Sequence, residues 1–243
     1  MNTTGRLSGR CVLVFGGTSG IGLATARAAA AHGAAVTVTS RSRERSERAA
    51  REIGEGARSE VANSLDEDEV RALYDRVGAV DHIVYTAGDD LVLSPVGKLD
   101  LAAARRAFDV RVFGVLAAVK HGATRVRPGG SIVLTHGIAG ARPSAGWSVG
   151  ASVCGAVDSL TRALAVELAP IRVNAVSPGF VRTPLWDPIP EAEREALFRD
   201  AGRKLLTGRV GEAPEIAEAY CFLMENPFTT GQTVVVDGGG TLV

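Results

Sequence analysis

Short apolar runs alternate with amphipathic helical patterns along the whole chain, and this alternation constrains the fold more than any other feature. A parallel sheet requires such an order, because successive strands must be joined by crossover connections that are usually helices. The candidate strands are 11–15, 35–39, 80–86, 131–135, 171–176 and 233–236, with a weaker one at 57–61. The sequence therefore predicts an α/β fold, a doubly wound parallel sheet of about seven strands flanked by helices, in a single domain over residues 1–243.

One segment departs from the alternation. Residues 183–190 are rich in proline, and a charged helical pattern follows at 191–204, between the last two predicted strands. Connections of this length inside a compact domain often carry function. We therefore expect residues 183–212 to form a lid over a substrate.

Composition excludes several classes of function. Lys plus Arg and Asp plus Glu number 27 each, which removes the electrostatic argument for a nucleic-acid or anionic-membrane partner. Even the alanine-rich stretch 154–169 carries three charged residues, so no membrane span is expected. The N-terminus reaches Arg10 before apolar residues accumulate, so no signal peptide is expected. Three scattered cysteines argue against a disulfide framework or a metal site and fit a reducing cytoplasm. The expected partner is a small molecule.

The first strand is followed by Gly-Gly-Thr-Ser-Gly-Ile-Gly at 16–22 and then by an alanine-rich helix. Glycines allow a tight turn and let backbone N–H groups approach a pyrophosphate at the N-terminus of a helix, where the dipole favours negative charge. The turn predicts a dinucleotide site. Its expected contacts are Gly16, Thr18, Ser19, Gly20, Ile21 and Gly22.

The second strand ends in Ser40-Arg41-Ser42-Arg43. An NAD site would place an acid here for the ribose 2′-hydroxyl, whereas a guanidinium binds a 2′-phosphate through charge-assisted bonds. We therefore expect NADP as the cofactor, with Ser40, Arg41 and Arg43 at the phosphate. The alternative is that both arginines only solvate a helix start.

The glycine spacing G-x-x-x-G-x-G, together with Thr86-Ala87-Gly88, the segment 174–179 and Asp-Gly-Gly at 237–239, resembles the short-chain dehydrogenase/reductase family. The resemblance covers residues 8–240 and implies a Rossmann fold that binds a nicotinamide cofactor. It places Glu60 and Val61 near the adenine, Thr86, Ala87 and Gly88 along the cofactor, and Pro178, Gly179, Val181 and Thr183 near the nicotinamide. Phe15 and Tyr85 depart from the family pattern on the first and fourth strands.

The resemblance fails at the catalytic positions. Members of the family usually carry Asn, Ser, Tyr and Lys there, and an ungapped alignment places Arg111, Gly137, Gly150 and Cys154 at these four positions. A shift of register cannot restore the pair, since no Tyr lies between residues 85 and 220 and no Lys between residues 120 and 204.

Two residues could replace part of the lost chemistry. Arg111 could hold developing negative charge on a substrate oxygen, although it is too basic to donate a proton, and His136 titrates near neutrality and could act as the acid. The alternatives are a solvated helix residue for Arg111 and a structural histidine for His136. The expected substrate contacts are Asp89, Asp90, Trp147, Ser148 and Cys154.

The sequence thus leaves three functions open. The first is an NADP(H)-dependent oxidoreductase with non-standard catalysis that reduces an activated carbonyl or an imine or iminium of a small molecule. The others are a non-catalytic NADP-binding sensor or partner protein, and a non-redox cyclase of a secondary-metabolite pathway. By resemblance, a homodimer or homotetramer should form through the helix at 150–168 and the helix that carries Arg111.

Overall fold

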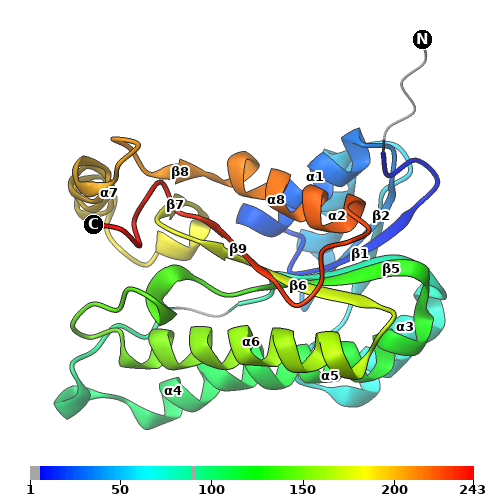
Figure 1. The fold of residues 1–243 in the computed structure, drawn as a ribbon, viewed down its shortest axis with the longest axis horizontal. Helices are drawn as coiled ribbons and strands as arrows, with labels where there is room; N and C mark the ends of the chain where they lie inside the picture. The colour runs from blue at the N-terminus through cyan, green and yellow to red at the C-terminus, as the bar shows by residue number, and fades with distance from the viewer. Residues whose placement is uncertain (1–5, 89–90) are drawn as a thin grey trace.

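The computed structural model describes residues 6–88 and 91–243. Among these residues, seven parallel strands form one sheet in the order β3-β2-β1-β4-β5-β6-β9 (Figure 1). The strands are β1 (Cys11–Phe15), β2 (Ala35–Ser40), β3 (Arg58–Val61), β4 (Val80–Tyr85), β5 (Val126–Thr135), β6 (Arg172–Pro178) and β9 (Thr233–Val236). This order is the doubly wound Rossmann arrangement, and the predicted fold is confirmed.

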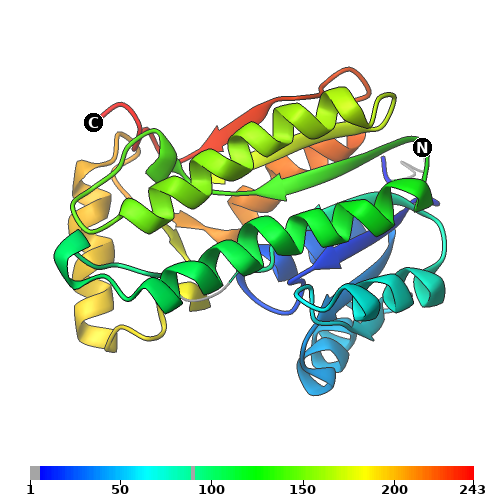
Figure 2. The same ribbon diagram turned by 90° about the horizontal axis from the view of Figure 1, so that it is seen from below.

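Helices cover both faces of the sheet. They are α1 (Gly20–Ala31), α2 (Arg43–Ile53), α3 (Glu67–Val77), α4 (Leu101–Phe108), α5 (Gly114–Gly122), α6 (Ser148–Glu167), α7 (Glu191–Lys204) and α8 (Ala213–Glu225). A π-helical turn, Asp109–Phe113, joins α4 to α5. Figure 1 shows α1, α2 and α8 on one face and α3, α5 and α6 on the other, and in Figure 2 the continuous α4–α5 helix runs beside α6.

The two faces follow from the alternation of side chains along each strand. On β1, Leu13 and Phe15 join the core under α3, α5 and α6, while Val12 and Val14 join the core under α1 and α8. Because both faces are buried, the inner strands read as continuous apolar runs. This explains why the strand positions could be predicted from the sequence.

Helix α6 is long and apolar enough to cross a membrane by length and composition, contrary to our expectation that no segment would be. The criterion is weak evidence, since the core helix of a folded domain also meets it. Val153 and Val157 on this helix are buried, and α6 packs against β5 and β6. Its apolar character therefore has an explanation inside the fold.

The segment expected to be a lid lies beyond the carboxyl ends of the strands. It contains α7 and the strand β8 (Gly211–Glu212), which pairs with β7 (Val181–Arg182). Trp186, Phe198, Leu205 and Val210 form a small apolar cluster of their own there. Whether the segment opens and closes stays a prediction.

Candidate functional site

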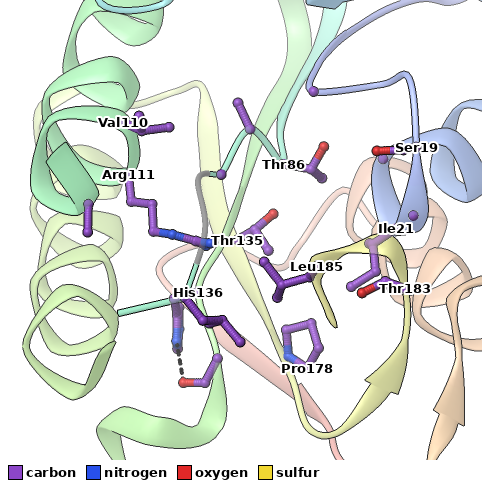
Figure 3. Close-up of a pocket in the computed structure, with 18 of the residues that line it drawn as sticks. Ser19, Ile21, Thr86, Val110, Arg111, Thr135, His136, Pro178, Thr183 and Leu185 are labelled. Atoms are coloured by element: carbon purple, nitrogen blue, oxygen red, sulfur yellow. Dashed lines mark hydrogen bonds between the residues drawn. The ribbon is translucent and has the colours of Figure 1, made fainter. Parts of the chain in front are cut away.

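A pocket of about 500 Å³ opens at the carboxyl edge of the sheet, where the strand order reverses between β1 and β4. Ligands of doubly wound sheets bind at such a switch point. Fifteen of the predicted cofactor contacts line it: Gly16, Thr18, Ser19, Gly20, Ile21, Gly22, Ser40, Arg41, Thr86, Ala87, Gly88, Pro178, Gly179, Val181 and Thr183. Figure 3 shows Ser19, Ile21 and Thr183 on one side of this pocket and Arg111 reaching in from the other.

The glycine turn has the geometry of a phosphate cradle. Gly16 and Gly20 adopt positive φ angles of 75° and 52°, a conformation that favours glycine. A Cβ on Gly22 would collide with the carbonyl oxygen of Gly16 and the hydroxyl of Thr86. Helix α1 starts within this segment, at Gly20, and its first turn carries no acidic residue. The residues present therefore fit a dinucleotide pyrophosphate.

Of the two arginines predicted at the 2′-phosphate, one lines the pocket and the other does not. Arg41 lines the pocket, but Arg43 lies outside it, 4.0 Å from the Glu47 carboxylate. The second arginine of the pocket is Arg45. Ser42 caps helix α2 by accepting a hydrogen bond from the backbone N–H of Arg45 at 3.3 Å, so the helical twist begins at Arg43 and turns it away. The Ser42 cap was the signal that could have located Arg45.

The two residues predicted near the adenine lie outside the main pocket. Glu60 and Val61 do not line the main pocket, and the Glu60 carboxylate accepts a hydrogen bond from Arg76 at 2.7 Å. Strand β3 ends at Val61, as predicted, and Val61 still pairs with Ser40 within the sheet. The residues that line the pocket after it are Ala62, Asn63, Ser64 and Leu65.

The four aligned catalytic positions do meet in space: Arg111, Gly137, Gly150 and Cys154 all line the pocket. A Cβ on Gly150 would find only Trp147 within 4 Å, at 3.9 Å, so there is room for a side chain to start at this position. The nearest guanidinium nitrogen of Arg111 lies 2.7 Å from where a Cβ on Gly88 would stand. The arginine therefore occupies the space that this glycine leaves beside the predicted cofactor path.

Arg111 lies in the π-helical turn between α4 and α5. The backbone N–H of Gly114 bonds to the carbonyl of Asp109, five residues back, instead of the usual four. Such turns are rare and occur frequently at functional sites. Of the described residues that line the pocket, the charged ones are Arg41, Arg45 and Arg111, and none is a carboxylate.

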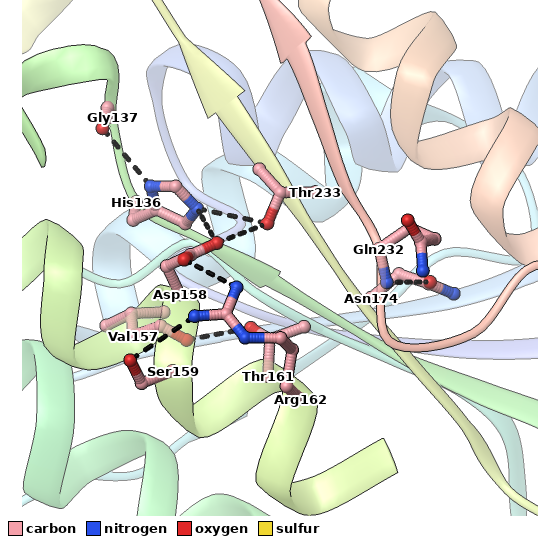
Figure 4. Close-up of polar contacts among 10 residues, drawn as sticks. All are labelled: His136, Gly137, Val157, Asp158, Ser159, Thr161, Arg162, Asn174, Gln232 and Thr233. Carbon is pink, nitrogen blue, oxygen red and sulfur yellow. Dashed lines mark hydrogen bonds and ion pairs between the residues drawn. The ribbon is translucent and has the colours of Figure 1, made fainter. Parts of the chain in front are cut away.

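His136 also lines the pocket, but both of its ring nitrogens face groups of the protein (Figure 4). Nδ1 lies 3.1 Å from the carbonyl oxygen of Gly137, and Nε2 lies 3.4 Å from the Thr233 hydroxyl and 3.8 Å from the Asp158 carboxylate. Burial lowers the pKa of His136, which favours the neutral imidazole. This arrangement favours the structural interpretation of His136, and its catalytic role stays a prediction.

Some of the predicted substrate contacts line the pocket and others do not. Trp147 and Cys154 line the pocket, and burial raises the pKa of the Cys154 thiol. Ser148 is exposed and lies outside it, because it is the first residue of α6 and the next two residues, Val149 and Gly150, face the pocket instead. Asp89 and Asp90 lie outside the described residues.

Two further aromatic residues, Phe180 and Trp186, complete this side of the pocket beside the predicted Trp147. Phe180 stacks on Trp186 with ring centroids 5.4 Å apart, and Trp147 meets Phe180 edge to face at 6.1 Å. All three line the pocket beside Leu185. The substrate side is therefore apolar and aromatic, apart from Arg111.

A family model described as enoyl-(acyl carrier protein) reductase matches residues 16–241. The short-chain dehydrogenase/reductase ucsE of Acremonium sp is 34% identical over 259 residues, covering 99% of this chain and 98% of the relative. The chain belongs to the short-chain dehydrogenase/reductase family. The cis-4-hydroxycyclohexanecarboxylate dehydrogenase of Sinomonas cyclohexanicum is 37% identical, covering 96% of this chain and 97% of the relative.

Solved structures of the family agree with the fold. A small-chain dehydrogenase in complex with NADPH has a TM-score of 0.86 at 35% identity and covers 96% of this chain and 99% of its own. The MalC reductase/Diels-Alderase of Malbranchea aurantiaca has a TM-score of 0.90 at 30% identity and covers 99% of both chains. The family uses nicotinamide cofactors, and its curated members similar to this chain are oxidoreductases.

Proposed function

We propose that this chain is an NADP(H)-dependent reductase that acts on an activated carbonyl, imine or iminium carbon without the tyrosine and lysine of its family. The observation that carries the proposal is the position of Arg111. Its guanidinium lies against Gly88 in a pocket whose nucleotide end has the expected turn. The site thus combines a cofactor cradle with a fixed cation at a family catalytic position.

The glycine turn, with Arg41 and Arg45, would hold the cofactor's phosphates, and Val181 and Thr183 would lie at its nicotinamide end. When bound, NADPH supplies a hydride, which is the redox chemistry of the reaction. The protein must then position the substrate and stabilise the charge that the reaction creates.

For a carbonyl substrate, the oxygen becomes negative as the carbon is reduced. A guanidinium that is already oriented stabilises this charge. Arg111 keeps its own proton at neutral pH, so the substrate oxygen takes its proton from water. Carbonyls that yield a weakly basic alkoxide suit this arrangement, which is why we infer an activated carbonyl.

For an iminium substrate, the reaction removes a positive charge instead of creating a negative one. The carbon accepts a hydride and the product is neutral, so no proton donor is needed. A nearby guanidinium repels the cationic substrate, while the faces of Trp147 and Phe180 can attract it. The two substrate classes therefore predict opposite effects of removing Arg111.

The test measures NADPH oxidation with a trifluoromethyl ketone and with a cyclic iminium in the wild type and in Arg111→Ala. Loss of an oxyanion donor costs about 2.7 to 4 kcal/mol, so kcat for the ketone should fall by roughly a hundredfold to a thousandfold. The matched control is Arg106→Ala, an exposed arginine on α4 that does not line the pocket. It should leave kcat unchanged. If neither compound oxidises NADPH although the cofactor binds, the proposal fails in favour of a non-catalytic NADP-binding protein.

A second candidate function is a cyclase. A Cβ on Gly150 would have only Trp147 near it, and the similar MalC structure is named a reductase/Diels-Alderase. An apolar, aromatic pocket of this kind could hold a folded substrate in a reactive conformation. The distinguishing result is conversion of a substrate to an isomer of equal mass without consumption of NADPH.

We also propose that the chain assembles as a homodimer or homotetramer and works in the cytoplasm on a small molecule. Support for assembly comes from exposed apolar side chains on the helices expected at the interface: Phe113 is 60% and Val166 is 83% exposed. The cysteines are free, which fits a reducing compartment.

A further inference from the structure

Tyr85, the last residue of β4, is buried and does not line the pocket, yet it contacts the helix that does. Its hydroxyl oxygen lies 2.7 Å from the carbonyl oxygen of Val110 and 3.1 Å from the Ser64 hydroxyl. A carbonyl only accepts, so the single phenolic proton goes to Val110 and Ser64 donates to Tyr85. Burial raises the pKa of Tyr85 to about 12, which keeps this donor protonated.

The carbonyl that Tyr85 binds belongs to the π-helical turn. In a regular α-helix the N–H of Gly114 would bond to the carbonyl of Val110, four residues back. Here that N–H bonds to Asp109 instead. The Tyr85 hydroxyl therefore takes the place of the helical donor at Val110, the residue directly before Arg111.

Phe15 and Gly114 also pack against Tyr85. Phe15 is the register partner of Tyr85 across β1 and β4, and their rings stack at 5.5 Å between centroids. A Cβ on Gly114 would collide with the Tyr85 hydroxyl. By the resemblance to the family, Phe15 and Tyr85 are also positions where these two strands depart from the usual pattern. The three residues thus form one packed unit against the turn that carries Arg111.

We propose that Tyr85 is a positioning residue, whose hydrogen bond to Val110 holds the π-helical turn open and thereby aims Arg111 into the pocket. The proposal rests on the proposed function only for its catalytic consequence. Removing the hydroxyl leaves the Val110 carbonyl free to accept from Gly114. Since each helical residue turns by about 100°, a one-residue change of register rotates Arg111 away from Gly88.

The test compares Tyr85→Phe with Tyr74→Phe. Tyr74 is an ideal control, because its hydroxyl donates to the carbonyl of Ala118 on α5 at 2.8 Å and its ring also neighbours Phe15. Each variant removes one buried bond from a tyrosine to the same long helix, but only Tyr85 binds the π-helical turn. A loss of stability that comes only from removing a buried hydrogen bond should therefore be similar in the two variants.

We expect Tyr85→Phe to lower kcat for the activated ketone by about tenfold to a hundredfold, with the Kd of NADPH unchanged. Tyr74→Phe should keep the wild-type kcat. In an Arg111→Ala background, Tyr85→Phe should have no further effect, since the side chain that it positions is gone. An equal loss of kcat in both tyrosine variants, or the same loss in the Arg111→Ala background, would overturn the proposal.

Amide hydrogen exchange tests the positioning role of Tyr85 whether or not the chain is a reductase. Exchange rates at residues 109–114 should change in Tyr85→Phe, because the hydrogen-bond pattern of the turn changes, and should stay at wild-type values in Tyr74→Phe, whether or not any compound is reduced. Gly114→Ala should unfold at a lower temperature than the wild type, and Gly114→Ala combined with Tyr85→Phe should recover part of that loss, because the collision is relieved. Unchanged exchange in Tyr85→Phe would overturn the positioning role even if the enzyme is a reductase.

Discussion

The preference for NADPH over NADH tests the nucleotide end of the site. Arg41 and Arg45 both line the pocket, and no carboxylate in the described part of the chain pairs with either of them. A charge-assisted hydrogen bond contributes about 1.5 to 3 kcal/mol. Both side chains are exposed, so we take the lower value, which gives about a tenfold weaker Kd for NADPH in each single variant to alanine.

The double variant Arg41→Ala, Arg45→Ala should lose roughly a hundredfold in affinity for NADPH and little for NADH, since NADH has no 2′-phosphate. Calorimetric titration with each cofactor measures the Kd of NADPH and the Kd of NADH. Arg43→Ala is the matched control, because this arginine lies two residues from each of the others but outside the pocket. Equal affinity for NADPH and NADH in the wild type, or an equal effect of Arg43→Ala, would refute the reasoning.

Three further predictions concern stability, binding and assembly. Burial lowers the pKa of His82 from 6.5 to about 4, so its stabilising contribution is complete above pH 6.5 and is lost on acidification. Urea unfolding of the wild type should show roughly 2 kcal/mol less stability at pH 4.5 than at pH 7, and His82→Gln should lose less. Gly22→Ala should abolish NADPH binding in the same titration, because its Cβ collides with the carbonyl of Gly16; retained affinity would contradict the cradle. Light scattering should give a dimer or tetramer that Phe113→Glu with Val166→Glu dissociates, and a monomeric wild type would contradict this assembly.

The fold could be predicted because its signals are local. Each buried strand is a short apolar run, and the turn at 16–22 needs glycine at fixed offsets for steric reasons that hold in any protein. The positions that line the pocket at the ends of β1, β4 and β6 followed from the family resemblance. Some side chains expected at the pocket lie outside it, because one or two residues decide which way a side chain faces, as at Arg43, Val61 and Ser148.

The support of Arg111 could not be predicted from its own helix. Residues 109–113 have no proline or other breaker, and their π-helical turn is matched to a hydrogen bond from Tyr85 on a distant strand. The surroundings of His136 could not be predicted from its own segment either, because its partners Thr233 and Asp158 come from β9 and α6. Such contacts are set by tertiary packing, which the pattern of one segment does not contain.

The pH dependence of kcat tests the central claim that a permanently charged arginine replaces the proton relay. Arg111 keeps its positive charge at every pH at which the enzyme would be assayed. Burial lowers the pKa of His136 below its ordinary 6.5 and raises that of Cys154 above its ordinary 9.0. These shifts move the titrations of His136 and Cys154 away from the range between about pH 7 and pH 8, in which Arg111 also keeps its charge. We predict that kcat for NADPH oxidation by the activated ketone is constant across that range in the wild type. A titration of kcat within it, with loss of activity as a proton is removed, would contradict the account.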